Sequence, residues 1–358
     1  MHLKNQKHRV EQSTTQPGFI LVMTLMLLSL ATVIITRVYY QAAGLSAYLH
    51  TSAERQQVRI LALSGLELAK SQLDNPTFEV DKYLEKIFPV LDVWQQVDLA
   101  PESTDVSGQI KLYISCELGK LNPNQLYDFK KRVFKPQIKP ALQKLCAKNG
   151  KLAGLADQLE QALQKRTAPL NDLSELLADP ALQQLFKDQL YRLPANSSTV
   201  ETGSSVSERV INTDAGTSQA DAPDKYYLTD LFTLYNPQPQ LWPALLAQDY
   251  LNLLQLNTAK TIAARRQGLQ QLLYAVTKAK KVLTQTEALS MLYSAPSLAQ
   301  LAPEIAQLFA VNFTPPVIFS VLVQATSGLN TARIFAILAA DSIEDAHMSY
   351  QLVRLYWI

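Results

Sequence analysis

The chain has 358 residues, 47% of them hydrophobic, so it can bury a core and has room for two or three domains. Its 33 basic and 31 acidic side chains leave a formal net charge of +2, which does not indicate the basic face of a nucleic-acid-binding protein. The sequence has no nucleophile-elbow or P-loop motif, and its four histidines have no metal-ligand neighbour at a convincing spacing. We therefore do not expect an enzyme.

The first predicted element is a helix that begins in an apolar segment. Phe19 to Thr36 is apolar apart from an occasional Thr or Ser, about the length that spans a bilayer as a helix. Lys4, Lys7 and Arg9 precede it, and this basic bias predicts a cytoplasmic N-terminus with everything after Arg37 across the membrane. Small residues suited to a signal-peptidase site lie well past the apolar core, so conventional removal is a poor fit.

The same helix continues as an amphipathic spine. No Pro occurs from Gly18 to Asn75, and Asn75-Pro76 predicts the end of the helix. Its length would be about 55 residues, or roughly 80 Å at about 1.5 Å per residue. The apolar residues of its second half recur at helical spacing, which predicts one face packed against other elements. These residues are Val58, Leu61, Ala62, Gly65, Leu66, Ala69 and Leu73.

A strand is predicted over Gln109–Cys116, where polar and apolar residues alternate as in a strand with one buried face. The next segment reads ELGKLNPNQL. Gly119 can supply a turn, and Asn122 or Asn124 can cap a helix that begins at about Gln125.

Leucines at helical spacing predict a long helical stretch from Gln125 to about Arg192, with short breaks and with Asn171 as an N-cap.

Two cysteines, Cys116 and Cys146, could form a disulfide if this part of the chain reaches an oxidising compartment, or stay as two buried thiols. Both alternatives stay open at this point.

The composition and the apolar period of the remaining chain change twice, first at about residue 195 and again after Pro316. Residues 195–225 are polar, rich in Ser and Thr, and too poor in large apolar residues to order themselves, which predicts a mobile loop. A short β-like run follows at Tyr226, and helices are expected from there to about Leu308. After Pro316 the pattern predicts a β-hairpin with Gly328 in its turn and a final strand at the C-terminus.

Together these features resemble the type IV pilin superfamily, which includes the pseudopilins of type II secretion. Members carry a basic leader that ends in Gly, then an aromatic residue and an apolar helix that continues into a globular head. The resemblance implies that the leader peptidase cuts between Gly18 and Phe19, and that the new amine of Phe19 is methylated. An uncleaved signal anchor is the alternative.

Two details are similar to the K-type minor pseudopilin. Most members have Glu at the fifth position after the cut, whereas this chain has Met23, and the K-type subunit, at the tip of the filament, also lacks that carboxylate. The segment after the predicted strand matches the K-type order of residues. The matching residues are Gly119, Lys120, Leu121, Asn122 and Asn124.

The implied fold is α+β and pilin-like, with a long N-terminal transmembrane and spine helix, a small antiparallel sheet, and a large, mostly helical insertion between strands. The corresponding boundaries are a leader at 1–18, the helix at 19–75, the first part of the β domain at 76–118, the insertion at 119–312 with its mobile loop near 195–225, and the closing strands at 313–358.

The resemblance implies a single-pass inner-membrane subunit with a periplasmic head. Its implied function is to initiate or cap the pseudopilus during protein export across the outer membrane. Its partners would be the I- and J-type minor pseudopilins, the major pseudopilin and the inner-membrane assembly platform, with the leader peptidase as processing enzyme and no nucleic acid. Some K-type proteins bind calcium, so the resemblance allows that cofactor, but no Asp/Asn-rich loop here has a convincing ligand spacing.

Two other functions remain as alternatives. The chain could be a minor pilin of a true type IV pilus, with the insertion serving adhesion or assembly. A membrane-anchored periplasmic enzyme is the weaker alternative, because it rests only on the size of the insertion.

Overall fold

The computed structural model describes residues 17–74, 80–99, 108–147, 149–194, 225–256, 267–272, 274–275, 283–293, 302–310, 317–344 and 347–358. The chain divides into two units, Met1–Gln56 and Gln57–Ile358. The described part of the first unit belongs entirely to helix α1 (Pro17–Leu73), which continues into the second unit. The second unit is called the head.

Within the head, α1 is the predicted amphipathic spine. Five residues of the predicted stripe are at most 3% exposed, whereas Arg59 and Glu67 on other faces are exposed. A β-carbon added to Gly65 would lie 2.7 Å from Cγ1 of Val323 and 2.8 Å from Cγ2 of Ile110, so the helix backbone lies close against two strands. The stripe is thereby confirmed: its buried members are Val58, Ala62, Gly65, Leu66, Ala69 and Leu73, and Leu61 is half-buried.

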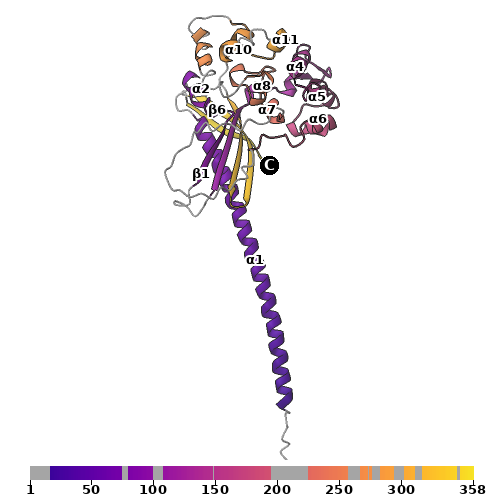
Figure 1. Cartoon of the computed structure of the whole chain (residues 1–358), viewed down its shortest axis with the longest axis vertical. Coiled ribbons are helices and arrows are strands. Elements are labelled where there is room, and N and C mark those ends of the chain that lie inside the picture. The colour runs from indigo at the N-terminus through magenta and orange to yellow at the C-terminus, as the bar shows by residue number, and fades with distance from the viewer. Residues whose placement is uncertain are drawn as a thin grey trace, which may run out of the picture. The chain divides into compact units, whose positions relative to one another are not determined.

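Five antiparallel strands form the main sheet, in the order β1-β2-β5-β6-β7. Strand β2 pairs directly with β5, although Cys116 and Ile318 are 202 positions apart in the sequence. Figure 1 shows the early strands, in purple, beside the late strands, in yellow. The bounds are β1 Trp94–Leu99, β2 Gly108–Cys116, β5 Ile318–Ser327, β6 Asn330–Glu344 and β7 His347–Trp357.

The second half of β2 is covered on both faces, which corrects the expectation of a single buried face for this strand. Leu112 and its neighbour Val323 lie beside Gly65 of α1. The next residue, Tyr113, is 5% exposed and lies on the opposite face, where the Arg192 guanidinium is 5.8 Å from its ring. The second half of β2 is therefore buried on both faces, because the insertion packs where solvent was expected.

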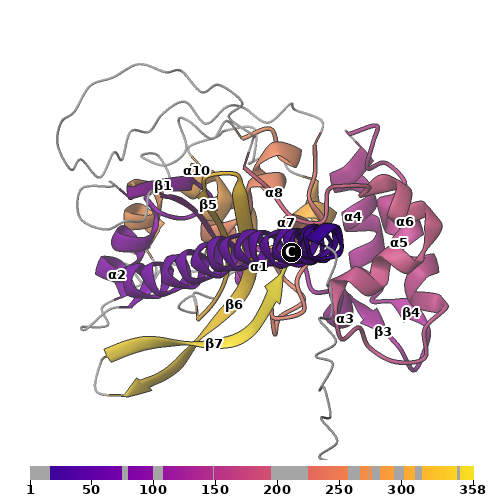
Figure 2. The same ribbon diagram turned by 90° about the horizontal axis from the view of Figure 1, so that it is seen from below.

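The segment between β2 and β5 is the predicted insertion, and its described elements are mostly short helices. Figures 1 and 2 both show α4, α5 and α6 gathered together, away from α2. The bounds are η1 Glu117–Gly119, α3 Pro123–Leu126, β3 Tyr127–Asp128, β4 Val133–Phe134, α4 Ile138–Ala147, α5 Leu155–Gln164, η2 Leu173–Ala178, α6 Pro180–Leu185, α7 Leu228–Leu231, η3 Pro243–Leu245, α8 Gln248–Leu253, α10 Gln285–Tyr293 and α11 Pro303–Ala306. The α+β class and the helical insertion between strands are confirmed.

Three local predictions for the insertion are wrong. The helix after Asn122 lasts only four residues, because the chain then turns into the small β3-β4 hairpin, where the ring of Tyr127 packs 5.7 Å from that of Phe134. The N-cap near 171 is Asp172, since its carboxylate accepts from Ser174 N and Glu175 completes a capping box. The β-like run after Tyr226 includes the helical turn α7.

The C-terminal strands follow the prediction. Gly328 lies in the β5-β6 turn with φ +56°, a conformation that favours glycine. The final strand is β7, and helix α2 (Val80–Ile87) and strand β1 are additions that the sequence pattern did not predict. The predicted leader before residue 17 and almost all of the loop at 195–225 lie outside the described residues.

Candidate functional site

The first half of α1 is an apolar surface. Among the described residues, α1 is long and apolar enough to cross a membrane, with a mean hydropathy of 2.6 in its most apolar part and none of that part buried. Tyr39 and Tyr40, both more than 70% exposed, follow the apolar segment beside Arg37. Aromatic and basic residues of this kind are enriched where a helix leaves the bilayer.

The residues implied in processing lie at the start of this helix. Gly18 is in its first turn, the side chain of Phe19 is 65% exposed, and that of Met23 is 48% exposed. Cleavage at Gly18 and methylation of Phe19 stay predictions, which the structure does not test.

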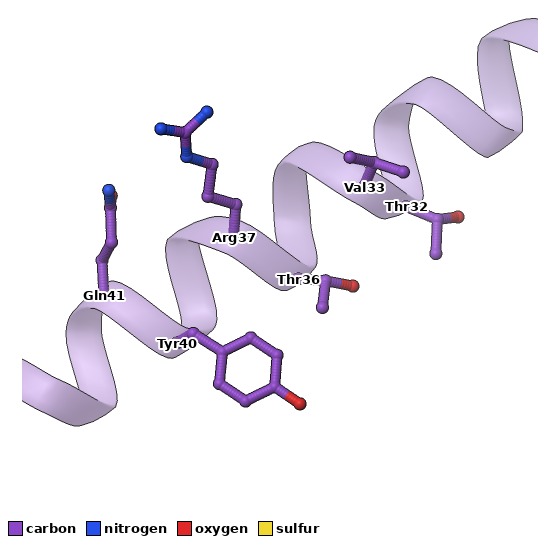
Figure 3. A pocket seen from close by; sticks show the side chains of 6 residues that line it. All are labelled: Thr32, Val33, Thr36, Arg37, Tyr40 and Gln41. Carbon is purple, nitrogen blue, oxygen red and sulfur yellow. The ribbon is translucent and has the colours of Figure 1, made fainter.

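A shallow hollow on α1 spans the end of the apolar segment, from Thr32 to Gln41. Figure 3 shows that all the side chains that line it project from one helix, so it is the side of α1 and not an enclosed binding cavity. The hydroxyl of Thr32 donates to the carbonyl of Leu28 at 2.8 Å, which satisfies it within the helix. The hollow therefore fits lipid or a neighbouring helix better than a polar ligand.

The second candidate site is the segment Gly119–Asn124, and the structure shows that it joins the insertion to the sheet. A β-carbon on Gly119 would lie 1.7 Å from the backbone oxygen of Leu245. The glycine is required by this close approach of two backbones. Gly119 also ends the 3-10 turn Glu117–Gly119, in which Lys120 N donates to the Glu117 carbonyl at 3.2 Å, so the predicted turn is confirmed, although its φ is not positive.

Lys120 is buried with a carboxylate partner. Its ammonium lies 2.6 Å from Oε1 of Glu117 and donates to the hydroxyl of Ser320 on β5 at 2.8 Å. Burial lowers the pKa of Lys120, but the carboxylates of Glu117, Asp230 and Asp92 together raise it above its ordinary value, so the side chain stays charged. The other oxygen of Glu117 accepts from the hydroxyl of Thr233. One buried ion pair thus connects β5 to the insertion.

The two asparagines of the segment bind backbone groups. Asn122 caps α3 through Asn124 N and donates to the carbonyls of Leu234 and Asn236 at 3.1 and 2.7 Å. Asn124 exchanges two hydrogen bonds with the backbone of Leu170. Leu121 is fully buried and pairs with Phe232 in an isolated bridge. These contacts are structural and place no reactive group toward solvent.

Lys120→Met should cost about 3 to 5 kcal/mol of unfolding free energy, because it leaves the buried carboxylate of Glu117 without its cation. The double variant Glu117→Gln/Lys120→Met should be more stable than the single one, since no unpaired charge remains. Urea unfolding of the full chain in detergent measures both. Lys144→Met, at an exposed ion pair with Glu304, should change stability by less than about 1 kcal/mol. If Lys120→Met lowers the free energy of unfolding no more than Lys144→Met does, the buried Lys120–Glu117 ion pair does not hold the insertion to the sheet.

A second buried ion cluster was not predicted. Arg192 donates to Asp230 at 2.7 Å and to Asp249 at 2.6 Å, and its guanidinium lies 4.6 Å from the ring centre of Tyr227. Burial lowers the pKa of Arg192, but the two carboxylates raise it well above its usual value. The three residues are far apart in sequence and share no motif, so no pattern could have paired them.

Cys116 and Cys146 are free, buried thiols, which is the second of the two alternatives considered for them. Within the described parts of the chain, no group of three or more His, Cys, Asp or Glu side chains could hold a metal ion. Residues 213–224, which read TDAGTSQADAPD and carry several side-chain oxygen atoms that calcium could use, lie outside those parts.

No protein-family model and no curated protein matches the chain. A similar chain occurs in the crystal structure of the GspK-GspI-GspJ complex from the enterotoxigenic Escherichia coli Type 2 Secretion System, with 12% identity and a TM-score of 0.44 over 86% of this chain and 98% of that chain. A likeness at this level is too low to assign a function.

Proposed function

We propose that this protein is a membrane-anchored assembly subunit of the pseudopilin type, without catalytic activity, that assembles at the tip of a type II secretion pseudopilus as the K-type minor pseudopilin. The observation that carries the proposal is α1: a single helix of 57 residues whose first half is apolar and exposed and whose second half is the buried spine of the head.

The contrast between the exposed first half of α1 and its buried second half supports this proposal. Leu25, Leu28 and Ile35 are each more than half exposed, and such an apolar surface is stable only in lipid or against other apolar helices. The buried stripe from Val58 to Leu73 packs on the sheet instead. A helix of this kind ties a head to a membrane, and across the inner membrane the positive N-terminal tail would keep its start cytoplasmic.

Met23 supports the position at the tip. A carboxylate at this depth in a membrane helix is costly unless a cation neutralises it. Ordinary subunits of the family are thought to obtain that cation from the amine of a neighbouring subunit. A subunit with no neighbour above it has no such cation, and Met23 avoids the need for one.

The head offers a surface for the other minor pseudopilins. Strand β7 is at the edge of the sheet and carries the exposed apolar residues Leu352, Val353 and Trp357. A long apolar edge strand that pairs on one side only is a site where another chain can add to the sheet. We assign the I- and J-type partners to this side of the head.

Co-purification from cross-linked membranes tests the proposal. The full-length protein should be recovered with the I- and J-type subunits in about equal amounts and should be scarce relative to the major pseudopilin. Met23→Glu should give no gain in assembly, and the charged residue should lower the amount of inserted protein. A protein distributed along the filament in amounts matching the major subunit, or one that binds neither minor partner, would contradict the tip position.

A further inference from the structure

The small hairpin of β3 and β4 carries a dense group of positive charges. The segment Asp128–Lys135 contains four basic side chains and one acidic one, an excess of three positive charges, whereas the whole chain has a formal net charge of +2. All four basic side chains are exposed. Figure 2 shows the hairpin beside α5. The basic hairpin patch consists of Lys130, Lys131, Arg132 and Lys135.

The hairpin is firmly held although each of its strands has only two residues. The ring centre of Tyr127 is 5.0 Å from that of Phe129 and 5.7 Å from that of Phe134, and both pairs pack edge to face. The Asp128 carboxylate accepts from two backbone amides of the loop, at 3.0 Å each. The patch therefore belongs to a loop with a defined conformation.

The positive charges of the patch lack partners within the described head, although protein surfaces usually intersperse the two signs. Nearby basic residues of the insertion are paired: Lys139 with Asp157 and Glu160, Lys144 with Glu304, Lys165 with Asp179, and Arg166 with Glu175. None of the four patch residues makes an ion pair with any residue that the structure describes. The backbone amides that bind Asp128 lower its pKa and occupy this carboxylate. An acidic partner would relieve the repulsion that remains.

Arg132 keeps its charge at a position where the backbone favours another residue. Its φ is +56°, in the left-handed region that glycine and asparagine adopt with less strain. An arginine there strains the loop, but its guanidinium offers a planar fork of donors that matches a carboxylate. The choice of residue therefore favours recognition over loop stability.

The hairpin offers charge without a free apolar or stacking surface. The ring of Phe129 packs on Tyr127, and the next three residues of the loop are all basic. Val133 is 45% exposed but is small. Surfaces that bind lipid bury larger apolar side chains in the bilayer, and single-stranded nucleic acids stack their bases on open aromatic rings. An acidic polypeptide needs only the charges, because its carboxylates pair with ammonium and guanidinium groups.

We propose that the basic hairpin patch docks an acidic segment of a partner protein, in which several Asp or Glu side chains follow one another. The patch belongs to the insertion and is separate in sequence from β7, the strand to which the I- and J-type partners are assigned. This inference goes beyond the proposed function and does not depend on it, since the head alone builds the patch.

Binding of fluorescein-labelled octaglutamate to the full chain in dodecyl maltoside tests the proposal. Fluorescence anisotropy at low salt should show saturable binding, whereas octaglutamine, which has no charge, should show none. Raising the salt to about 0.5 M should weaken the binding several-fold, because exposed charges are screened. Absence of saturable binding, or equal binding of octaglutamate and octaglutamine, would overturn the proposal.

The triple variant Lys130→Gln/Lys131→Gln/Arg132→Asn assigns the binding to the hairpin. It removes three charges, and asparagine suits the left-handed backbone at its position. Octaglutamate should bind about tenfold more weakly, because three exposed ion pairs are lost. The melting temperature should stay close to that of the wild type, so that the loss reports charge and not unfolding. Full binding in this variant would show that the patch is not the site.

Two controls separate this site from general attraction between charges. Lys144→Gln/Lys165→Gln/Lys187→Gln removes three exposed charges elsewhere in the insertion and should leave binding unchanged. An eight-residue thymidine oligonucleotide should bind more weakly than octaglutamate, and glycerol phosphate at constant ionic strength should not displace the peptide. Equal losses in the two triple variants, tighter binding of the oligonucleotide, or displacement by glycerol phosphate would overturn the assignment to an acidic protein segment.

Discussion

Leu66→Asp should abolish the cooperative thermal transition of the head. Leu66 is 3% exposed and belongs to the stripe of α1 that packs on the sheet. Losing a buried leucine side chain costs about 2 to 5 kcal/mol, and burying a carboxylate without a partner costs several more. The sum is comparable to the whole stability of a typical domain, about 5 to 15 kcal/mol. Limited proteolysis and thermal melting of the full chain in detergent should both show an unfolded head.

Ile60→Asp is the matched control for this variant. It lies six residues earlier on the same helix, but its side chain is 63% exposed, so the new charge stays in water. Its melting temperature should remain close to that of the wild type, since surface substitutions usually change stability by less than about 0.5 kcal/mol. If Leu66→Asp and Ile60→Asp resist protease equally well, α1 does not pack on the sheet as described.

Gly119→Ala should be the most damaging single-methyl change in the head. The new β-carbon would lie 1.7 Å from the Leu245 carbonyl oxygen and 3.1 Å from the amide nitrogen of Ala247. Both neighbours are backbone atoms, so relief requires separating two segments that are hydrogen-bonded through Trp242 N and the carbonyl of Leu118. Overpacking of this kind costs about 3 kcal/mol or more. The midpoint of urea unfolding should fall accordingly.

Gly150→Ala serves as the control for Gly119. Nothing lies within 4 Å of the position that its β-carbon would take. We expect a change of less than about 0.5 kcal/mol, as for an ordinary surface site. Similar midpoints for the two alanine variants would mean that Gly119 is not required by the contact with Leu245.

Elements with a long, regular period could be predicted from the sequence. The stripe of α1, strand β2 and the hairpin around Gly328 repeat their apolar pattern over many residues, so periodicity identifies them. The pairing of β2 with β5 could be expected only from the order of the family-like segments. No local pattern connects two strands whose nearest ends are 202 positions apart in the sequence.

The insertion was predicted less well, because its elements are short. A four-residue helix such as α3 gives no period to count, and its end is set by the hairpin that follows. The segment Gly119–Asn124 could be recognised as a motif, but its role depends on distant partners such as Leu245 and Asn236. The Arg192 cluster has no sequence signal at all, since only the tertiary fold brings its two aspartates to the guanidinium.

The mass and N-terminal residue of the protein purified from membranes test the central proposal most directly. A pseudopilin-type subunit should begin at Phe19 with a methylated amine, and Gly18→Ala should leave much of the leader attached. A mature chain that begins at any residue other than Phe19 would contradict the proposal and favour an uncleaved or conventionally cleaved membrane protein.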